Sequence, residues 1–168
     1  MISVENVGVI HDLISATLEH WKAPEHVAHR VGVLIPDPSE IQFTDAMARE
    51  DRGVRAGELY MFTSDIVVHS TWECPEWEDS APRASGVTVE AWSRRTLESV
   101  AIYSDSDGRV NIDGDWKGSI GKGWPGSARI TLKYPDHDDV VLPLGDRARV
   151  RRDHVGEFIP NLVADLNR

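Results

Sequence analysis

The segment Gly57-Glu58-Leu59-Tyr60-Met61-Phe62-Thr63-Ser64-Asp65-Ile66-Val67-Val68-His69 decides the fold. Large apolar residues fill both sides of Thr63-Ser64-Asp65, and short polar side chains of this kind favour a tight turn. The apolar pattern continues to Trp72. The segment therefore predicts an antiparallel β-hairpin over residues 57–72.

Alternating apolar residues on both sides of this hairpin predict further strands. They occur at Val87, Val89 and Ala91, at Leu97, Val100 and Ile102, at Val110 and Ile112, at Ala128, Ile130, Leu132 and Tyr134, and at Val140 to Leu142. Before the hairpin, Val31, Val33 and Ile35 take every second position, and Ile41 and Phe43 resume the alternation after Pro36 and Pro38. We expect about seven antiparallel strands in a β meander over residues 30–145.

Polar or glycine-rich stretches separate these strands. Residues 48–57 carry many charges and are expected to form an exposed loop, and residues 73–86 have the composition of a long connecting loop. Asp105-Ser106-Asp107-Gly108 is typical of a tight turn, and residues 114–127 contain five glycines and one proline, which indicates a loop or an irregular edge.

A helix is predicted at each end of the chain. Apolar residues recur at spacings of three and four within residues 1–23, at Val7, Ile10, Ile14, Leu18 and Trp21, with Ser3 as the expected N-cap and Pro24 as the stop. A similar pattern over residues 156–167 predicts a short C-terminal helix, in which Pro160 is tolerated only near the first turn. The fold class is α+β: a bent sheet or open barrel with an N-terminal amphipathic helix and a C-terminal capping helix.

Length and composition restrict the class of protein. The chain has 168 residues, which predicts a single domain over residues 1–168. A formal net charge of −10 disfavours nucleic acid and anionic membranes as partners. The first residues contain no basic leader with an apolar region, which predicts a cytoplasmic location. Cys74 is the only cysteine, so no internal disulfide forms.

The segment from Gly57 to His69 resembles the strand-turn-strand of bacterial pleckstrin-homology-like domains. Trp92 to Ile102, the hairpin from Ile130 to Leu144, and the helix from Phe158 to Leu166 follow in the order of that family, so the resemblance covers roughly residues 57–168. It implies a seven-stranded bent antiparallel sheet capped by a C-terminal helix, and a role in binding proteins, peptides or lipid headgroups. The N-terminal helix departs from the family pattern.

Motifs of enzymes and metal sites are incomplete in this sequence. Gly121-Lys122-Gly123-Trp124-Pro125-Gly126 matches GxGxxG, but its β context favours a plain loop. The aspartates at 105, 107, 113 and 115 lack EF-hand spacing, and His26 with His29 lacks a third ligand nearby. Ser119 is outside any nucleophile elbow, and Cys74 lies in an acidic stretch. We expect no catalytic residue, no metal and no cofactor.

Two groups of residues are candidates for binding. Trp72, Trp77, Trp116 and Trp124 lie in or beside expected loops, where large aromatics either plug the end of a β-sandwich or form a recognition surface. Arg147, Arg149 and Arg151 would share one face of an extended segment and grip phosphate or carboxylate, or else form a solvated patch.

These observations favour a non-enzymatic binding module whose partner is a protein. Self-association is a second option, because the N-terminal apolar stripe packs against either the same chain or another copy. Two alternatives remain: a small-ligand or catalytic domain using a tryptophan-lined end of the sandwich, and a lipid-headgroup binder using Arg49, Arg52 and Arg55 or the later arginines.

Overall fold

The hairpin around Thr63 is formed as the sequence predicts. In the computed structural model it joins strand β2 (Val54–Phe62) to strand β3 (Ile66–Glu76). The Thr63 Oγ1 atom accepts hydrogen bonds from the backbone N–H groups of Asp65 and Ile66, at 3.2 and 3.1 Å. This turn sets the register of the two strands, in which Tyr60 lies opposite His69.

The structure describes residues 3–18, 21–51, 54–76, 83–104, 128–145 and 148–167. The chain divides into two compact units, Met1–Arg94 and Arg95–Arg168. The first unit contains a four-stranded antiparallel sheet, and the second contains a three-stranded antiparallel sheet.

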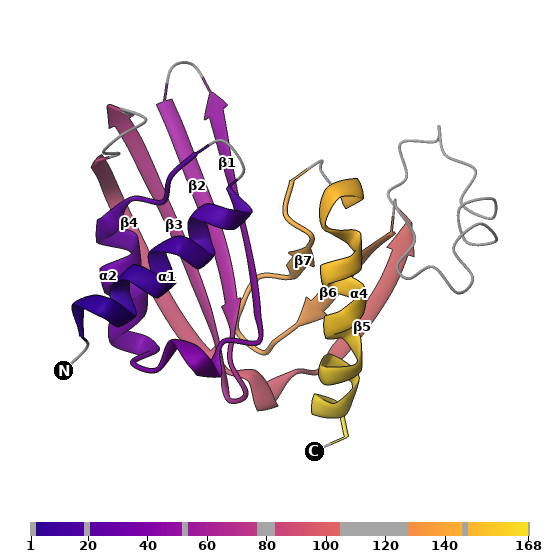
Figure 1. Cartoon of the computed structure of the whole chain (residues 1–168). Coiled ribbons are helices and arrows are strands. Elements are labelled where there is room, and N and C mark those ends of the chain that lie inside the picture. Colours follow the sequence, from indigo (N-terminus) through magenta and orange to yellow (C-terminus); the bar gives the residue numbers. More distant parts are fainter. Residues whose placement is uncertain are drawn as a thin grey trace. The chain divides into compact units, whose positions relative to one another are not determined.

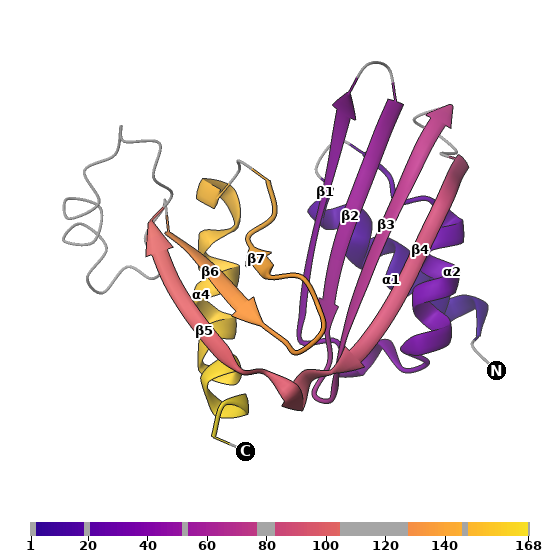
Figure 2. The ribbon, with the colours of Figure 1, turned by 180° about the vertical axis from the view of Figure 1, so that it is seen from behind.

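The four-stranded sheet of the first unit is a meander in the order β1-β2-β3-β4 (Figure 2). Strand β1 spans Phe43–Asp51 and β4 spans Arg83–Ser93. The prediction of an exposed loop over residues 48–57 is therefore wrong, because β1 and β2 pair as far as Asp51 and Val54. Strands β3 and β4 likewise extend into the expected loop of residues 73–86. Charged side chains are compatible with strands when one face of an antiparallel sheet meets water.

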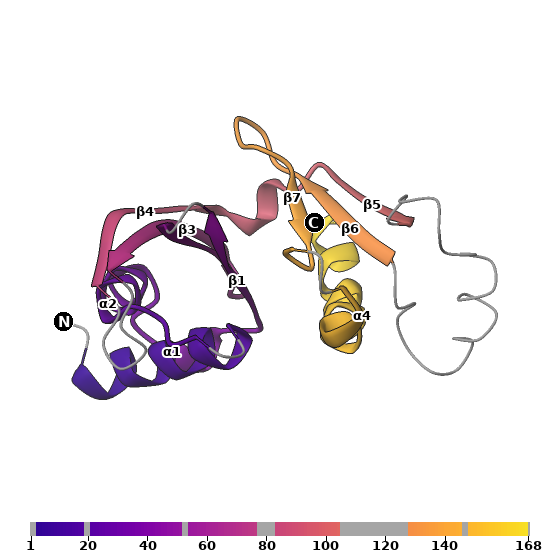
Figure 3. The ribbon, with the colours of Figure 1, turned by 90° about the horizontal axis from the view of Figure 1, so that it is seen from above.

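Two helices, α1 (Val4–Thr17) and α2 (Glu25–Leu34), lie across one face of this sheet (Figure 1), and Figure 3 shows the sheet curving over them. The predicted N-cap is confirmed, since Ser3 Oγ accepts from the Asn6 N–H at 3.1 Å. Helix α1 ends at Thr17, before the expected Trp21. The core between helices and sheet contains Val7, Ile10, Ile14, Leu18, Ala23, Val27, Ala28, Val31, Ile35, Ala46, Leu59, Met61, Val68, Trp72 and Cys74.

Helix α2 replaces the strand predicted from the alternation of Val31, Val33 and Ile35. The core face of the helix is given by Val27, Ala28 and Val31, at helical spacing, whereas Val33 is 71% exposed. Three alternating apolar residues are too few to separate a strand from one side of a helix. A short 3₁₀ helix, Pro38–Glu40, follows before β1.

Trp72 is the largest fully buried side chain of the described residues. Its indole lies over Gly57, its register partner on β2. A Cβ atom built on Gly57 would come within 2.1 Å of the indole Cε2 and Cζ2 atoms. The Trp72 indole therefore fits in the core because Gly57 has no side chain.

In the second unit, strands β5 (Ser99–Ser104), β6 (Ala128–Lys133) and β7 (Val140–Leu142) pair in that order, after a 3₁₀ turn at Arg94–Thr96. The predicted hairpin from Ile130 to Leu144 is confirmed. The Leu142–Pro143 peptide bond is cis, and the Arg129 guanidinium donates to the carbonyl oxygens of Pro143 and Gly145, at 3.3 and 2.6 Å.

The C-terminal helix α4 spans Ala148–Asp165 and buries Val155, Phe158 and Leu162. It begins eight residues before the expected position 156, so Pro160 lies inside the helix and not in its first turn. Arg149 and Arg151 belong to this helix, and the extended segment predicted for them is wrong.

The α+β class, the seven antiparallel strands and the helices near both termini are confirmed in the described part of the chain, which adds helix α2 to the expected elements. Within the same residues, no helix has the length and apolar character needed to cross a membrane.

Candidate functional site

A histidine lies between two glutamates on the four-stranded sheet. We call the sheet surface opposite α1 and α2 the distal face. On this face the His69 Nε2 atom lies 3.2 Å from Glu58 Oε1, and Nδ1 lies 3.0 Å from Glu90 Oε1. Glu58 comes from β2, His69 from β3 and Glu90 from β4, so the contacts join three neighbouring strands.

The geometry favours the charged form of His69. A carboxylate only accepts hydrogen bonds, so both ring nitrogens must carry a proton to satisfy both contacts. Burial by itself would lower the pKa of His69, but the hydrogen bonds and negative charges of Glu58 and Glu90 outweigh burial and raise this pKa. An imidazolium with both nitrogens donating has no lone pair with which to accept a substrate proton.

Aromatic rings hold the imidazole in place. The Tyr60 ring stacks on it with a centroid distance of 4.4 Å and an interplanar angle of 13°. Trp92 meets it edge-on at 6.4 Å. Tyr60 is the register partner of His69, and stacking of this kind fixes the ring orientation.

A hollow of about 180 Å³ lies beside Glu58. Most of its lining side chains belong to the distal face and come from β1, β2 and β3, and β4 contributes Gly86. The lining residues are Met47, Arg49, Ala56, Gly57, Glu58, Thr71, Trp72, Glu73 and Gly86. Arg49, Thr71 and Glu73 are exposed, so the hollow opens to solvent.

The only cysteine lies on the other face of the sheet, in the core beneath the helices. Cys74 is 1% exposed. Burial raises the pKa of its thiol to about 11, although the nearby Arg55 charge acts in the opposite direction. The thiolate is the reactive form of cysteine, so this environment suppresses nucleophilic chemistry at neutral pH.

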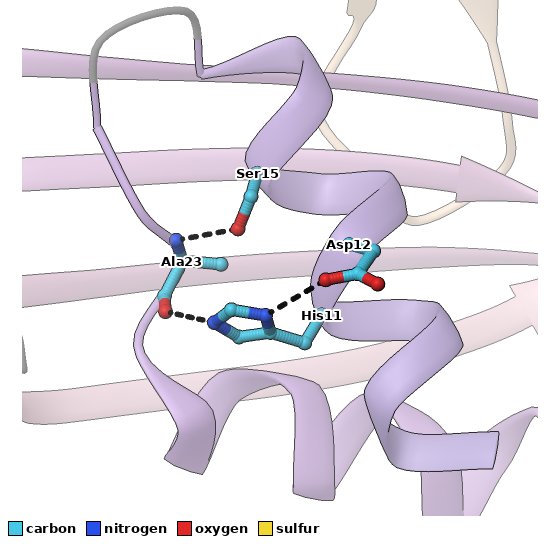
Figure 4. A network of polar contacts seen from close by, with 4 residues as sticks. All are labelled: His11, Asp12, Ser15 and Ala23. Atoms are coloured by element: carbon cyan, nitrogen blue, oxygen red, sulfur yellow. Dashed lines mark hydrogen bonds and ion pairs between the residues drawn. The ribbon is translucent and has the colours of Figure 1, made fainter. Parts of the chain in front are cut away.

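A second polar network, shown in Figure 4, fastens the connection between α1 and α2. His11 Nε2 donates to the Ala23 carbonyl oxygen at 2.9 Å, and Ser15 Oγ accepts from the Ala23 N–H at 3.0 Å. His11 Nδ1 lies 3.5 Å from the exposed Asp12 carboxylate. Because both backbone groups of Ala23 are satisfied by one face of α1, we assign this network a role in folding.

The tryptophans predicted as a binding surface are only partly described. Trp72 is a core residue that also lines the hollow. Trp77, Trp116 and Trp124 lie outside the described residues, as do Arg147, the aspartate turn at 105–108 and the GxGxxG stretch. The side chains of Arg149 and Arg151 lie outside the described part as well.

The structure does not gather the earlier arginines into one patch. Arg49 lies on the distal face, whereas the Arg55 guanidinium lies 4.2 Å above the Trp21 ring and 3.1 Å from Glu50 Oε2. Arg52 is outside the described residues. Among the described residues, no group of three or more histidine, cysteine and acidic side chains is arranged to hold a metal ion.

Sequence reasoning missed the cluster of Glu58, His69 and Glu90. The turn at Thr63 places Tyr60 opposite His69. Counting residues outward from this turn could therefore have predicted the contacts of His69 with strand β2. Comparisons with protein-family models, curated proteins and solved structures find no match to this chain.

Proposed function

We propose that the chain is a non-enzymatic protein-binding module whose partner docks on the distal face of the four-stranded sheet. The observation that carries this proposal is the solvent-open hollow, which combines charged, polar and apolar lining residues on a sheet packed against two helices. Surfaces that bind other proteins mix polar, charged and apolar groups in the same way.

The chemistry of the described residues supports binding over catalysis. The two carboxylates beside His69 raise its pKa and favour its charged form, and Cys74 is a buried thiol with a raised pKa. Neither environment suits a general base or a nucleophile at neutral pH. The resemblance of residues 57–168 to pleckstrin-homology-like domains, which bind proteins, peptides or lipid headgroups, supports the same proposal.

A photo-crosslinking experiment tests the docking face. Thr88 is exposed on β4 and lies opposite Thr71, a lining residue of the hollow. A photoreactive amino acid at position 88 of the full chain, irradiated in the producing cells, is expected to capture one defined protein. The matched control carries the same group at Val33, which is 71% exposed on α2.

The crosslinked partner is then purified, and its binding to the wild type is measured by calorimetry. Saturable one-to-one binding that Thr88→Arg abolishes supports the module. Equal capture from Val33 and Thr88, capture of this chain alone, or no capture at all contradicts a protein partner at the distal face.

A further inference from the structure

The floor of the hollow is a short side chain between longer ones. Ala56 on β2 lies opposite Arg49 on β1 and, on its other side, opposite Glu73 on β3. In the next row, Glu58 lies between Met47 and Thr71. The methyl group of Ala56 thus leaves a depression that the side chains of both rows surround.

Two carboxylates stand on the β2–β3 side of this depression. Glu73 is a diagonal neighbour of Glu58, and such positions lie about 7–8 Å apart between Cα atoms. Glu58 uses Oε1 for His69, and its Oε2 atom accepts no hydrogen bond from a described residue. The Glu73 side chain forms no hydrogen bond or ion pair with a described residue. A cation between them would relieve the repulsion of two like charges.

The hollow already contains one cationic side chain, Arg49, which lies on its β1 side. Arg49 and Glu73 are separated by one intervening strand, so their backbones lie about 10 Å apart. Arg49 forms no ion pair with a described residue. The hollow is therefore polarised, with its negative side at β2 and β3.

We propose that the hollow receives a lysine or arginine side chain of the partner protein, an inference that rests on the function proposed above. The alkyl stem lies over Met47 and Ala56, and the charged head lies between Glu58 and Glu73. Long basic side chains bury their methylene groups in this manner while the charge meets polar atoms. The net charge of −10 adds a long-range attraction for a basic partner.

A titration followed by nitrogen-15 NMR tests the proposal on the full chain. The probe is N-acetyl-arginine methylamide, and the uncharged control is N-acetyl-norleucine methylamide, which keeps the alkyl stem. We expect the arginine probe to shift the amide signals of Ala56, Thr71 and Glu73 in a saturable manner, and the norleucine probe to leave them unchanged.

Three variants separate a specific site from general attraction. Glu73→Gln is expected to weaken the arginine probe about three- to fivefold, the range of a partly exposed ion pair. Glu25→Gln removes an equal charge at an exposed position on α2, outside the hollow, and is expected to change binding by less than about twofold. Arg49→Ala is expected to strengthen binding, because it removes a like charge.

Equal losses in Glu73→Gln and Glu25→Gln, equal shifts with both probes, or weaker binding by Arg49→Ala would each overturn the inference. The partner captured at Thr88 separates this inference from the protein-binding proposal. If that partner binds Glu73→Gln as tightly as the wild type, the protein-binding proposal is kept, and the proposal that a basic side chain enters the hollow is wrong. If the arginine probe binds but no partner is captured, the hollow is a site for small cations and both proposals fail.

Discussion

Substitution of Gly57 by alanine is expected to destabilise the protein strongly. The added Cβ atom would lie 2.1 Å from two carbon atoms of the Trp72 indole, whereas carbon atoms in van der Waals contact lie about 3.5–4.0 Å apart. The rigid, buried indole must therefore move by more than about 1 Å. Overpacking of this kind costs about 1–3 kcal/mol, and the higher backbone entropy of glycine offsets only about 0.5–1 kcal/mol.

We therefore expect Gly57→Ala to lower the free energy of unfolding by about 2 kcal/mol, because an overlap with a rigid ring lies at the upper end of the overpacking range, about 3 kcal/mol, and the glycine entropy offsets about 1 kcal/mol of it. The assay is urea denaturation followed by far-ultraviolet circular dichroism, because loss of a tryptophan would confuse a fluorescence signal. A matched control is Gly8→Ala in α1, where an added Cβ atom meets nothing within 4 Å. Alanine in a helix should stabilise by up to about 1 kcal/mol there.

A double-mutant cycle tests the physical reason. Trp72→Phe removes the indole Nε1 and Cζ2 atoms that the new Cβ would meet, together with an N–H group that has no hydrogen-bond partner among the described residues. In this background Gly57→Ala is expected to lower the free energy of unfolding by less than about 1 kcal/mol. The difference from its cost in the wild type is the coupling energy, and it has the size seen between residues in contact. The reasoning is refuted if Gly57→Ala costs the same in both backgrounds or stabilises the protein as Gly8→Ala does.

Three further predictions concern titration, reactivity and the α1 network. The pKa of His69 is raised on folding. Its ion pairs therefore stabilise the folded protein fully at pH values below the pKa of unfolded histidine, near 6.5, and this stabilisation is lost as the pH rises through the pKa of the folded state. His69→Gln should thus lower the free energy of unfolding, measured by chemical denaturation, by about 1 kcal/mol more at pH 5.5 than at pH 8.5. An equal loss at both pH values would contradict the charged form of His69. With a pKa of about 11, Cys74 should react with Ellman's reagent at pH 8 at least roughly 200-fold more slowly than in urea, and rapid labelling of the folded protein would disprove its burial. His11→Ala should lower the free energy of unfolding by about 1 kcal/mol through loss of the bond to Ala23, whereas Asp12→Ala should change it by less than about 0.5 kcal/mol; equal effects would show that the bond contributes nothing.

The sequence predicts the fold best where local chemistry leaves few choices. Ser3 caps α1, and the Thr63 side chain closes the β2–β3 turn, both through short hydrogen bonds between near neighbours in the chain. The apolar stripe at Val7, Ile10 and Ile14 is long enough to specify a helix. Such features need no knowledge of distant residues.

The wrong secondary-structure predictions lie where contacts between residues distant in sequence determine the local structure. Val31 and Ile35 fit either a strand or a helix until the sheet supplies the surface against which Val27, Ala28 and Val31 pack. Charged residues near the β1–β2 turn indicate a loop only if both faces meet water, and the structure places Ala48 against the core. Packing against a tertiary surface overrides the local signal in both segments.

The candidate site was harder to predict than the fold. The turn at Thr63 sets the contacts of His69 with Tyr60 and, one row along, with Glu58. The position of Glu90 depends instead on the β3–β4 connection and on register shifts between Thr71 and Glu76. Whether Trp77, Trp116 and Trp124 add to a binding surface stays a prediction, because they lie outside the described residues.

The meander order of the four-stranded sheet has a kinetic consequence. Each strand pairs only with its neighbour in the chain, and the β1–β2 and β2–β3 connections are two and three residues long. Contacts between residues close in sequence lower the entropy lost before the first pairs form, which speeds folding. All of these strands precede Arg95, so during synthesis the sheet can close over α1 and α2 before the second unit has left the ribosome.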